Sequence, residues 1–358
     1  MKAATAAKLP FPTFKVCAYS DGLRLIGTDT TTLWVSVRVP AEVTEVGEAV
    51  LSPTLFKQVV SLLGNGEVEM EVREGMFAIF AEEGEHFLPL GVPDFFPLER
   101  EKEGVLHPLQ IPPTELAKAI ELVQPSASKE KMSIHSSVVI TKRDGLVDIF
   151  ATDTFRMSVM SYQADYKGVT CPIPLPQVPH LLTALSYPNV SVEIEGSHPP
   201  VVWVTSLDIT LTLLCMSGEL VPNHKRVLEM ADERLKPAFT VDGVDLLKRL
   251  QRLKAWDKET RNLTVRATAE GNSLTIELYG LEMGDWRKLA TEKVKAEVVN
   301  PCILTFNPAF VYDTLKAVKP KGLITVKAEG KTGQGLVELS IEDVPNLRHI
   351  FMEKLLEV

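Results

Sequence analysis

Two Thr-Asp pairs, Thr28-Asp29 and Thr152-Asp153, are the first candidates for acid–base chemistry in this sequence. A catalytic carboxylate needs a partner group, and each pair stands where one apolar strand is expected to turn into the next. Aspartate is common at such places because its carboxylate accepts hydrogen bonds from nearby backbone N–H groups. We therefore predict that both aspartates cap turns, and an enzyme that uses Asp29 or Asp153 is a distant alternative.

Motifs for other kinds of catalysis are absent from the sequence. There is no phosphate-binding Gly-rich loop, no His-x-x-x-His pair and no Gly-x-Ser-x-Gly segment. The seven histidines form no cluster with metal-ligand spacing, and the four cysteines include no Cys-x-x-Cys pair. Lone histidines such as His135 and His180 are more often satisfied core or surface residues than ligands. The sequence therefore predicts a protein that is not an enzyme and binds no metal or cofactor.

The length of 358 residues predicts two or three domains, and 45% hydrophobic with 24% charged residues is typical of a globular protein. No run of eighteen apolar residues predicts a membrane helix, and residues 1–10 are too short and polar for a signal-peptide core. We therefore expect a cytoplasmic protein without a membrane partner. The net charge of −9 argues against a protein that coats nucleic acid over its whole surface, but it allows a local basic face.

An internal repeat organises the chain. Residues 21–37 read DGLRLIGTDTTTLWVSV and residues 144–161 read DGLVDIFATDTFRMSVMS, which match with one inserted residue. A weaker third copy, GNSLTIELYG, stands at 271–280. Each copy predicts a Gly turn that leads into a strand of alternating apolar residues. The spacing of the copies predicts three repeats.

Further elements recur around each copy. A strand, a helix with Pro near its start and a second strand are expected at 50–72, 171–195 and 302–328. A strand that runs into a Pro-containing loop is expected at 87–98 and 213–228, with 348–358 in the corresponding place. Two more amphipathic helices, at 114–124 and 243–256, each follow a short strand, whereas the first repeat has only thirteen residues before Phe14 and lacks this opening strand and helix.

Together these elements predict an α+β fold of three repeated domains. Polar, Pro-containing stretches near 99–107 and 229–237 suggest the boundaries. The predicted domains are 1–103, 104–231 and 232–358.

Charge divides between the expected helices and strands. The five helix segments sum to +4, so the rest of the chain carries −13, and strand segments such as GEVEMEVREG and VSVEIEG are visibly acidic. A charged face on a single helix usually means only that this face is exposed to water. Opposite signs on all helices and all strands favour helices that face a phosphate backbone without reading its sequence.

The repeats resemble the bacterial β sliding clamps, the β subunits of DNA polymerase III that act as processivity factors in DNA replication. Residues 151–157, Ala-Thr-Asp-Thr-Phe-Arg-Met, resemble the family segment Ala-Thr-Asp-Gly-His-Arg-Leu. Residues 221–228, Val-Pro-Asn-His-Lys-Arg-Val-Leu, resemble Phe-Pro-Asp-Tyr-Arg-Arg-Val-Leu, and residues 307–318 are similar to the third-domain helix. The likeness runs in register from about Phe14 to the end of the chain.

The resemblance implies a ring of two chains joined head to tail, with β-sheet outside and helices lining a hole for duplex DNA. It implies a sliding clamp that encircles double-stranded DNA without sequence preference and tethers the replicative polymerase. The expected DNA contacts on the helices are Lys57, Lys118, Lys248, Arg249, Arg252, Lys254, Lys316 and Lys319. The expected dimer interface joins Phe87 and Leu90 of one chain to Ala255 and Trp256 of the other.

The resemblance also implies a pocket that binds a linear peptide motif of polymerase, clamp loader and repair proteins. Its expected residues are Ile134, Thr152, Arg156, Met157, Pro222, Arg226, Val227, Ile350 and Met352. Arg156 and Arg226 are expected at the rim, and Met157, Val227 and Met352 inside. The alternative for these residues is plain interdomain packing.

Three features depart from the family pattern: the missing opening of the first repeat, Thr154 and Phe155 in place of Gly and His, and a different tail after Met352. The bulkier residues at 154 and 155 predict a bulkier groove floor. The alternative function is a β-rich repeat scaffold or ligand-binding protein that does not encircle DNA.

Overall fold

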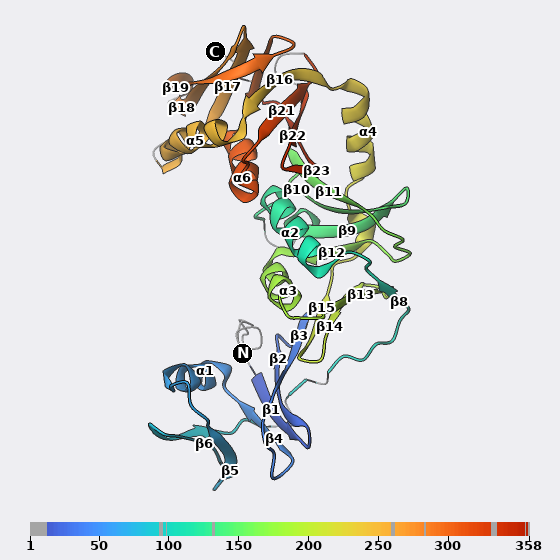
Figure 1. Ribbon diagram of the computed structural model, residues 1–358, viewed down its shortest axis with the longest axis vertical. Helices are drawn as coiled ribbons and strands as arrows, with labels where there is room; N and C mark the ends of the chain where they lie inside the picture. The colour runs from blue at the N-terminus through green and yellow to red at the C-terminus, as the bar shows by residue number, and fades with distance from the viewer. Residues whose placement is uncertain are drawn as a thin grey trace. The chain divides into compact units, whose positions relative to one another are not determined.

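The computed structural model describes residues 13–92, 96–97, 99–130, 133–258, 262–282, 284–330, 335–354 and 356. The chain divides into two compact units. Unit 1 comprises Met1–Ala117 with Tyr166–Gly218, and unit 2 comprises Lys118–Asp165 with Glu219–Val358. The ribbon in Figure 1 shows both units, each built of helices packed on antiparallel strands.

The elements repeat three times along the chain. The first repeat holds β1 (Thr13–Tyr19), β2 (Gly22–Thr28), β3 (Leu33–Val39), β4 (Gly47–Leu51), α1 (Pro53–Leu62), β5 (Glu69–Arg73), β6 (Met76–Ala81) and β7 (Gly84–Pro89). The second holds β8 (Leu106–Pro108), α2 (Pro113–Val123), β9 (Ser137–Arg143), β10 (Leu146–Thr152), β11 (Arg156–Gln163), β12 (Cys171–Pro174), α3 (Val178–Leu185), β13 (Ser191–Glu195), β14 (Val201–Thr205) and β15 (Ile209–Leu214). The third holds β16 (Lys236–Asp242), α5 (Gly243–Leu253), β17 (Thr264–Glu270), β18 (Ser273–Glu282), β19 (Asp285–Val298), β20 (Cys302–Phe306), α6 (Pro308–Val318), β21 (Leu323–Ala328), β22 (Leu336–Ile341) and β23 (Val344–Met352).

This order confirms the predicted repeat. The second and third repeats each open with a strand and a helix, β8–α2 and β16–α5, whereas the first begins at β1 among the described residues. The predicted absence of an opening strand and helix concerns residues 1–12, which lie outside the described residues. The domain boundaries at 103/104 and 231/232 stay predictions.

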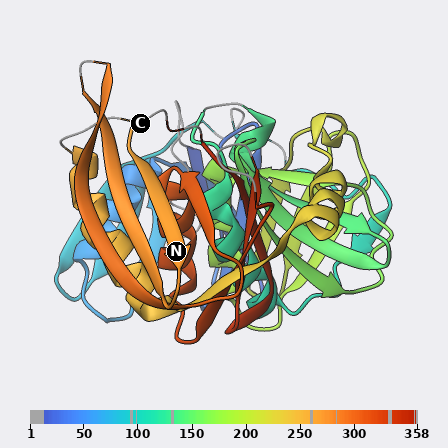
Figure 2. The same ribbon diagram turned by 90° about the horizontal axis from the view of Figure 1, so that it is seen from above.

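The repeats join edge to edge within each unit. In unit 1 the strand order is β4-β1-β2-β3-β15-β14-β13-β8, and a separate sheet has the order β5-β6-β7. In unit 2 the order β9-β10-β11-β23-β22-β21-β16-β19-β18-β17-β20 continues across the two repeats. Figure 2 shows the long β18–β19 hairpin of unit 2 in orange. The third strand of one repeat therefore pairs with the last strand of the next, as β3 with β15 and β11 with β23.

Glycine at the first hairpin turns explains why the two sequence copies begin alike. Gly22 has φ +132 and Gly145 has φ +82, where side chains other than glycine are strained. The apolar stripes predicted for the amphipathic helices are confirmed as core faces. Leu116, Ile120 and Val123 of α2 are each 0% exposed, and Leu246, Leu250 and Leu253 of α5 are 5%, 1% and 1% exposed.

Helix α4 (His224–Arg234) corrects the prediction for the end of the second repeat. The sequence predicted a loop up to residue 228 and a boundary stretch near 229–237, but residues 224–234 are helical. The Asn223 side chain caps this helix by accepting a hydrogen bond from the Arg226 N–H at 3.1 Å. Leu228 and Ala231 are its buried apolar residues. Among the described residues, no helix is long and apolar enough to cross a membrane.

Candidate functional site

The β10–β11 turn carries the sequence motif most similar to the clamp family. Thr152 Oγ1 donates a 2.7 Å hydrogen bond to the Arg156 carbonyl and accepts one of 3.1 Å from the Thr154 N–H. The Asp153 carboxylate accepts hydrogen bonds from the N–H groups of Phe155 and Arg156 at 3.1 and 3.0 Å. These bonds hold Thr154 at φ 78, in the left-handed region. The turn-capping role predicted for Asp153 is confirmed.

The equivalent turn in unit 1 uses the same chemistry. Thr28 Oγ1 accepts a 2.9 Å hydrogen bond from the Thr30 N–H, and Asp29 Oδ1 accepts bonds of 2.6 and 2.7 Å from the N–H groups of Thr32 and Leu33. Burial alone would raise the pKa of Asp29, but the hydrogen bonds from Thr32, Leu33 and the neighbouring backbone outweigh it and lower the pKa below its ordinary value. Both Thr-Asp pairs therefore build turns.

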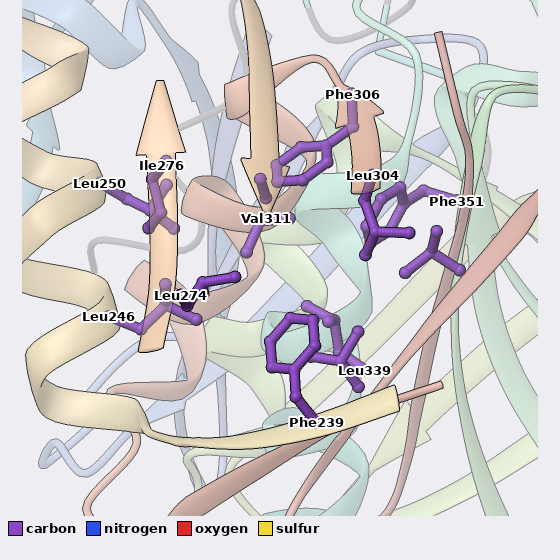
Figure 3. Close-up of a pocket in the computed structure, with 13 residues that line it drawn as sticks. Phe239, Leu246, Leu250, Leu274, Ile276, Leu304, Phe306, Val311, Leu339 and Phe351 are labelled. Atoms are coloured by element: carbon purple, nitrogen blue, oxygen red, sulfur yellow. The ribbon is translucent and has the colours of Figure 1, made fainter. Parts of the chain in front are cut away.

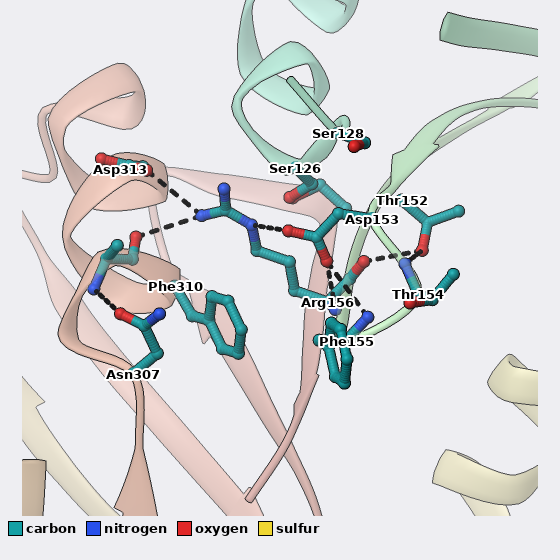
Figure 4. A network of polar contacts seen from close by, with 12 residues as sticks. Ser126, Ser128, Thr152, Asp153, Thr154, Phe155, Arg156, Asn307, Phe310 and Asp313 are labelled. Carbon is teal, nitrogen blue, oxygen red and sulfur yellow. Dashed lines mark hydrogen bonds and ion pairs between the residues drawn. The ribbon is translucent and has the colours of Figure 1, made fainter. Parts of the chain in front are cut away.

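Arg156 is buried, which corrects the rim position predicted for it. Its side chain is 6% exposed, and its Nε lies 2.9 Å from Asp153 Oδ2. Its Nη1 lies 3.3 Å from Asp313 Oδ2 and 3.1 Å from the Ala309 carbonyl, both on helix α6. The guanidinium also lies over the Phe310 ring, 5.2 Å from its centroid. Figure 4 shows this convergence, by which Arg156 joins the β10–β11 turn to α6.

The predicted interior of the pocket is partly closed. Met157 and Ile350 pair across β11 and β23 and are 4% and 2% exposed. They belong to an apolar cluster of buried residues, which we call the α4 cluster: Val139, Phe150, Met157, Val159, Leu228, Ala231 and Ile350. Val227 packs against this cluster, so helix α4 supplies part of the cover. Met157 is therefore a core residue.

A buried carboxylate, that of Asp148, holds His224, the first residue of α4, in place. Asp148 on β10 is 0% exposed and lies 2.9 Å from His224 Nε2, and it also pairs with Arg143 and accepts a 2.7 Å bond from Ser161 Oγ. The His224 ring stacks on Phe150 at a centroid distance of 4.4 Å. Burial would raise the pKa of Asp148, but the bonds from His224, Arg143 and Ser161 lower it. His224 and Asp148 are 76 positions apart, so no local sequence signal indicated this pair.

A second buried polar chain lies between β11, β23 and α6. Ser126 Oγ lies 2.7 Å from Ser158 Oγ, which lies 2.8 Å from His349 Nδ1. Thr314 Oγ1 lies 3.2 Å from the same nitrogen. Burial lowers the pKa of His349 to about 3, and the nearby Arg156 charge acts in the same direction. His349 is therefore neutral in the folded protein near pH 7.

The neutral state of His349 makes unit 2 sensitive to acid. Because its pKa is lowered from 6.5 to about 3 in the folded state, the unfolded chain takes up the proton first as the pH falls. Its contribution to stability is complete above pH 6.5 and is lost on the way to pH 3, at up to about 1.4 kcal/mol per pH unit. We expect urea unfolding of His349→Gln to show lower stability at pH 7 and a flatter dependence between pH 6.5 and 4. The same slope in variant and parent would contradict this assignment.

The exposed part of the predicted site lies at the ends of β11 and β23. The Met352 N–H donates a 2.9 Å hydrogen bond to the Phe155 carbonyl, so these residues are neighbours. Their side chains are 45% and 61% exposed, and Leu336 pairs with Met352 from β22. The ring of Phe155 is therefore on the surface, and the bulkier groove floor that the sequence predicted stays a prediction.

The remaining predicted pocket residues differ in burial. Thr152 is buried in the turn, Pro222 and Val227 are half-buried, and Arg226 is exposed on the first turn of α4. Ile134 is half-buried in a 3₁₀ turn at Ile134–Ser136, ahead of β9. The structure thus gathers Thr152, Met157, Ile350 and Met352 on three neighbouring strands, β10, β11 and β23, with Val227 against the cluster they border.

The predicted DNA-contacting residues fall into two groups. Arg249 and Arg252 on α5 share Glu292, at 3.1 and 3.4 Å, and Lys254 lies 3.3 Å from Asp313. The other five are exposed lysines that make no ion pair within the described parts of the chain: Lys57, Lys118, Lys248, Lys316 and Lys319. The net positive charge available to an anion on α5 is therefore smaller than the sequence count suggested.

The predicted interface residues are accessible. Strand β7 is an edge of the β5-β6-β7 sheet, and its Phe87 is 50% exposed. Leu90, just after β7, is half-buried. Ala255 is exposed and Trp256 is 37% exposed, both in the 3₁₀ helix Lys254–Lys258.

A cavity of about 30 Å³ lies in the core of the third repeat. Helices α5 and α6 contribute Leu246, Leu250 and Val311, and the sheet contributes Phe239 and Phe351 among others (Figure 3). Its lining is apolar, so it offers a ligand no polar contact. In the described ranges no group of His, Cys, Asp or Glu is arranged to hold a metal ion.

Comparison with solved structures identifies the fold. No family model and no curated protein matches the chain. A DNA polymerase sliding clamp from Pseudomonas aeruginosa, solved with a ligand, matches with a TM-score of 0.84 and 18% identity over 99% of this chain and 95% of that chain. The chain has the sliding-clamp fold. A P. aeruginosa sliding clamp bound to griselimycin matches at 0.84 and 17% identity, over 99% of this chain and 96% of that one.

A more distant solved structure supports the same fold. A putative DNA polymerase III β subunit from Eubacterium rectale matches with a TM-score of 0.80 and 13% identity, over 98% of this chain and 94% of that chain. The sliding-clamp fold confirms the α+β class and the three-repeat organisation predicted from the sequence. At these identities the likeness concerns the fold, and the divergence is large.

Proposed function

We propose that this chain is a DNA sliding clamp, a non-catalytic processivity factor that encircles duplex DNA and tethers a replicative polymerase. The observation that carries the proposal is the repeated strand junction. The third strand of one repeat pairs with the last strand of another at β3–β15 and again at β11–β23. Among the described strands, two members of this pattern remain unpaired with a counterpart: β19, the third strand of the third repeat, and β7, the last strand of the first repeat.

A second copy of the chain supplies the missing partners. Strand β7 is an open sheet edge, and β19 pairs with β16 only through residues 296–298 on the side away from β18. Joining β19 of one copy to β7 of the next repeats the junction at both ends and closes a head-to-tail ring of two chains. Sheet edges that stay open invite pairing with another chain, so a buried junction also explains the exposed Phe87 and Trp256.

The DNA contacts in this proposal come from the exposed lysines on the helices. Lys57, Lys118, Lys248 and Lys316 lie on α1, α2, α5 and α6, and the Lys254 ammonium is partly neutralised by Asp313. Contacts made by lysine to phosphate alone give weak, salt-dependent binding without sequence preference. Such contacts suit a protein that must slide.

The test of the function is retention on closed DNA. Protein assembled in the presence of nicked circular plasmid should co-elute with the plasmid in gel filtration, and linearising the plasmid should release it. A β-rich scaffold or ligand-binding protein would show no such difference. Retention that persists on linear DNA would contradict encirclement.

The exposed lysines should set the salt dependence of DNA binding. Lys248→Gln with Lys316→Gln should lower the slope of log affinity against log salt by about 0.9 for each phosphate that the protein no longer neutralises, equally for any DNA sequence. Binding is measured by fluorescence anisotropy on short duplexes between low and moderate salt. The matched control, Lys129→Gln with Lys142→Gln, removes the same charge from exposed positions outside the helices and should leave the slope unchanged. Equal slopes for both double variants would refute the assignment.

The partner site in this proposal is the surface around Phe155 and Met352, beside the α4 cluster. It offers the exposed apolar side chains of Phe155 and Met352, and Arg226 is exposed on the first turn of α4. A linear peptide of polymerase, clamp loader or repair proteins would place an apolar anchor there. The expected location is the cytoplasm, where such partners replicate DNA.

A further inference from the structure

Two of the four cysteines meet inside unit 1. Cys171 is the first residue of β12, and Cys215 directly follows the last residue of β15. Both are free thiols, and the Cys171 thiol donates a hydrogen bond to Cys215 Sγ across an Sγ–Sγ distance of 3.3 Å. The two sulfur atoms would have to approach by about 1.3 Å to reach the ~2.05 Å of a disulfide bond.

Backbone hydrogen bonds hold the two segments together at this point. The Met216 N–H donates a 3.0 Å hydrogen bond to the Pro172 carbonyl, so the residues that follow the two cysteines are bonded to each other. The Cys215 N–H donates a 2.9 Å hydrogen bond to the Pro200 carbonyl. The backbone around both cysteines therefore fixes the approach of the two sulfur atoms.

The two thiols differ in what they can do. The hydrogen bond to Cys215 and burial raise the pKa of Cys171 well above its ordinary value, so Cys171 keeps its proton. Cys215 accepts that hydrogen bond, and it is 6% exposed where Cys171 is 0% exposed. A reagent from solution therefore reaches the sulfur of Cys215 first, with the Cys171 thiol directly behind it.

Burial limits the size of that reagent. Oxidation of a cysteine depends on access to its sulfur, and hydrogen peroxide is only slightly larger than a water molecule. A protein disulfide or another bulky oxidant would need unit 1 to open first. The site thus suits a small peroxide.

We propose that Cys171 and Cys215 are a redox modification site, at which hydrogen peroxide converts the two thiols into a disulfide. The Cys215 sulfur attacks the O–O bond of the peroxide, which leaves a sulfenic acid on Cys215 and releases one water. The Cys171 sulfur then attacks the sulfenic sulfur, so the S–S bond forms, the S–O bond breaks and a second water leaves. The thiols lose two protons and two electrons, and the peroxide takes up both. This chemistry does not depend on the protein acting on DNA.

The other two cysteines are internal controls. Cys17 is 3% exposed, and burial raises its pKa. Cys302 is half-buried, and burial raises its pKa to about 11. Among the described residues, neither of their sulfur atoms bonds another cysteine. If burial alone governed the reaction, Cys17 and Cys215 would respond alike.

The test is oxidation of the folded full chain with hydrogen peroxide, followed by catalase, unfolding, alkylation and mass spectrometry of a digest without reductant. The free thiols should fall from four to two, with Cys171 linked to Cys215 and with Cys17 and Cys302 alkylated. Dithiothreitol should restore all four. Cys171→Ser should give no link and should leave a sulfenic acid on Cys215 that dimedone traps, whereas the control Cys302→Ser should keep the link.

Three results would overturn the proposal. The first is four free thiols after peroxide treatment of the folded chain. The second is a link that involves Cys17 or Cys302, or one that forms only when the oxidation is carried out in urea. The third is oxidation of Cys215 to a sulfinic acid in the parent without a link to Cys171, because the second thiol would then not act.

Discussion

In the proposed ring, Phe87→Asp should convert the dimer into a folded monomer that no longer remains on circular DNA. Phe87 is half-exposed on the edge strand β7, where the repeated junction calls for a strand of another copy. A charge placed in the buried centre of an interface typically costs at least about 2 kcal/mol, so the dimer dissociation constant should rise roughly 30-fold or more. Light scattering measures the mass, with the monomer at 39.6 kDa.

Trp256→Asp should act in the same way from the opposite side of the junction. Leu207→Asp is the matched control, because Leu207 is 85% exposed in the turn between β14 and β15, away from any open sheet edge. The control should remain dimeric. A dimer that survives both Phe87→Asp and Trp256→Asp would mean that the chains join through another surface.

Much of the fold could be predicted because its signals are local. Gly145 must have positive φ to make the β9–β10 turn, and the alternating strands on each side need no distant information. The stripe of Leu246, Leu250 and Leu253 likewise predicts which face of α5 is buried, because residues three and four positions apart share a helix face. The same local signals for strands, turns and helices occur three times along the sequence, and this repetition predicted the three-repeat fold.

Helix α4 shows where local signals were misread. Asn223 caps the helix, and Val227, Leu228 and Ala231 have helical spacing, so the signal was present. The flanking prolines at 222 and 237 and the charged residues between them favoured a loop instead. What stabilises α4 is tertiary: its first residue bonds the buried Asp148, 76 positions earlier. Such a pair leaves no trace in the local sequence.

Arg156 shows a similar limit for the candidate site. Its place beside Asp153 follows from the turn, but its second carboxylate, Asp313, comes from α6 at a sequence distance of 157. The buried guanidinium of Arg156 pairs with two carboxylates and lies over an aromatic ring, so it holds the β10–β11 turn against α6. Its hydrogen-bonding groups are therefore not available to bind a ligand. The resemblance gave the candidate residues of the partner site, which stays a prediction, whereas the burial of each side chain needed the structure.

This burial changes which substitution isolates the partner site. Met157→Glu would place a charge in the α4 cluster, where Met157 is 4% exposed, and would destabilise unit 2 itself. Phe155 and Met352 are exposed at 61% and 45%, so replacing them leaves the core intact. In the proposed partner site, they are the residues whose replacement is expected to separate partner binding from folding.

Phe155→Glu with Met352→Glu should abolish stimulation of a tethered polymerase while the mass and the retention on circular DNA stay unchanged. An apolar anchor buried against these two side chains contributes roughly 1.5–3 kcal/mol, so the affinity for a partner peptide should fall about 10- to 100-fold. Calorimetry with the polymerase's own linear peptide measures the affinity, and urea unfolding checks that stability matches the parent. The matched control is Leu220→Glu, which is 77% exposed in the 3₁₀ turn before α4 and should bind normally. A peptide affinity within twofold of the parent in the double variant would mean that partners dock elsewhere.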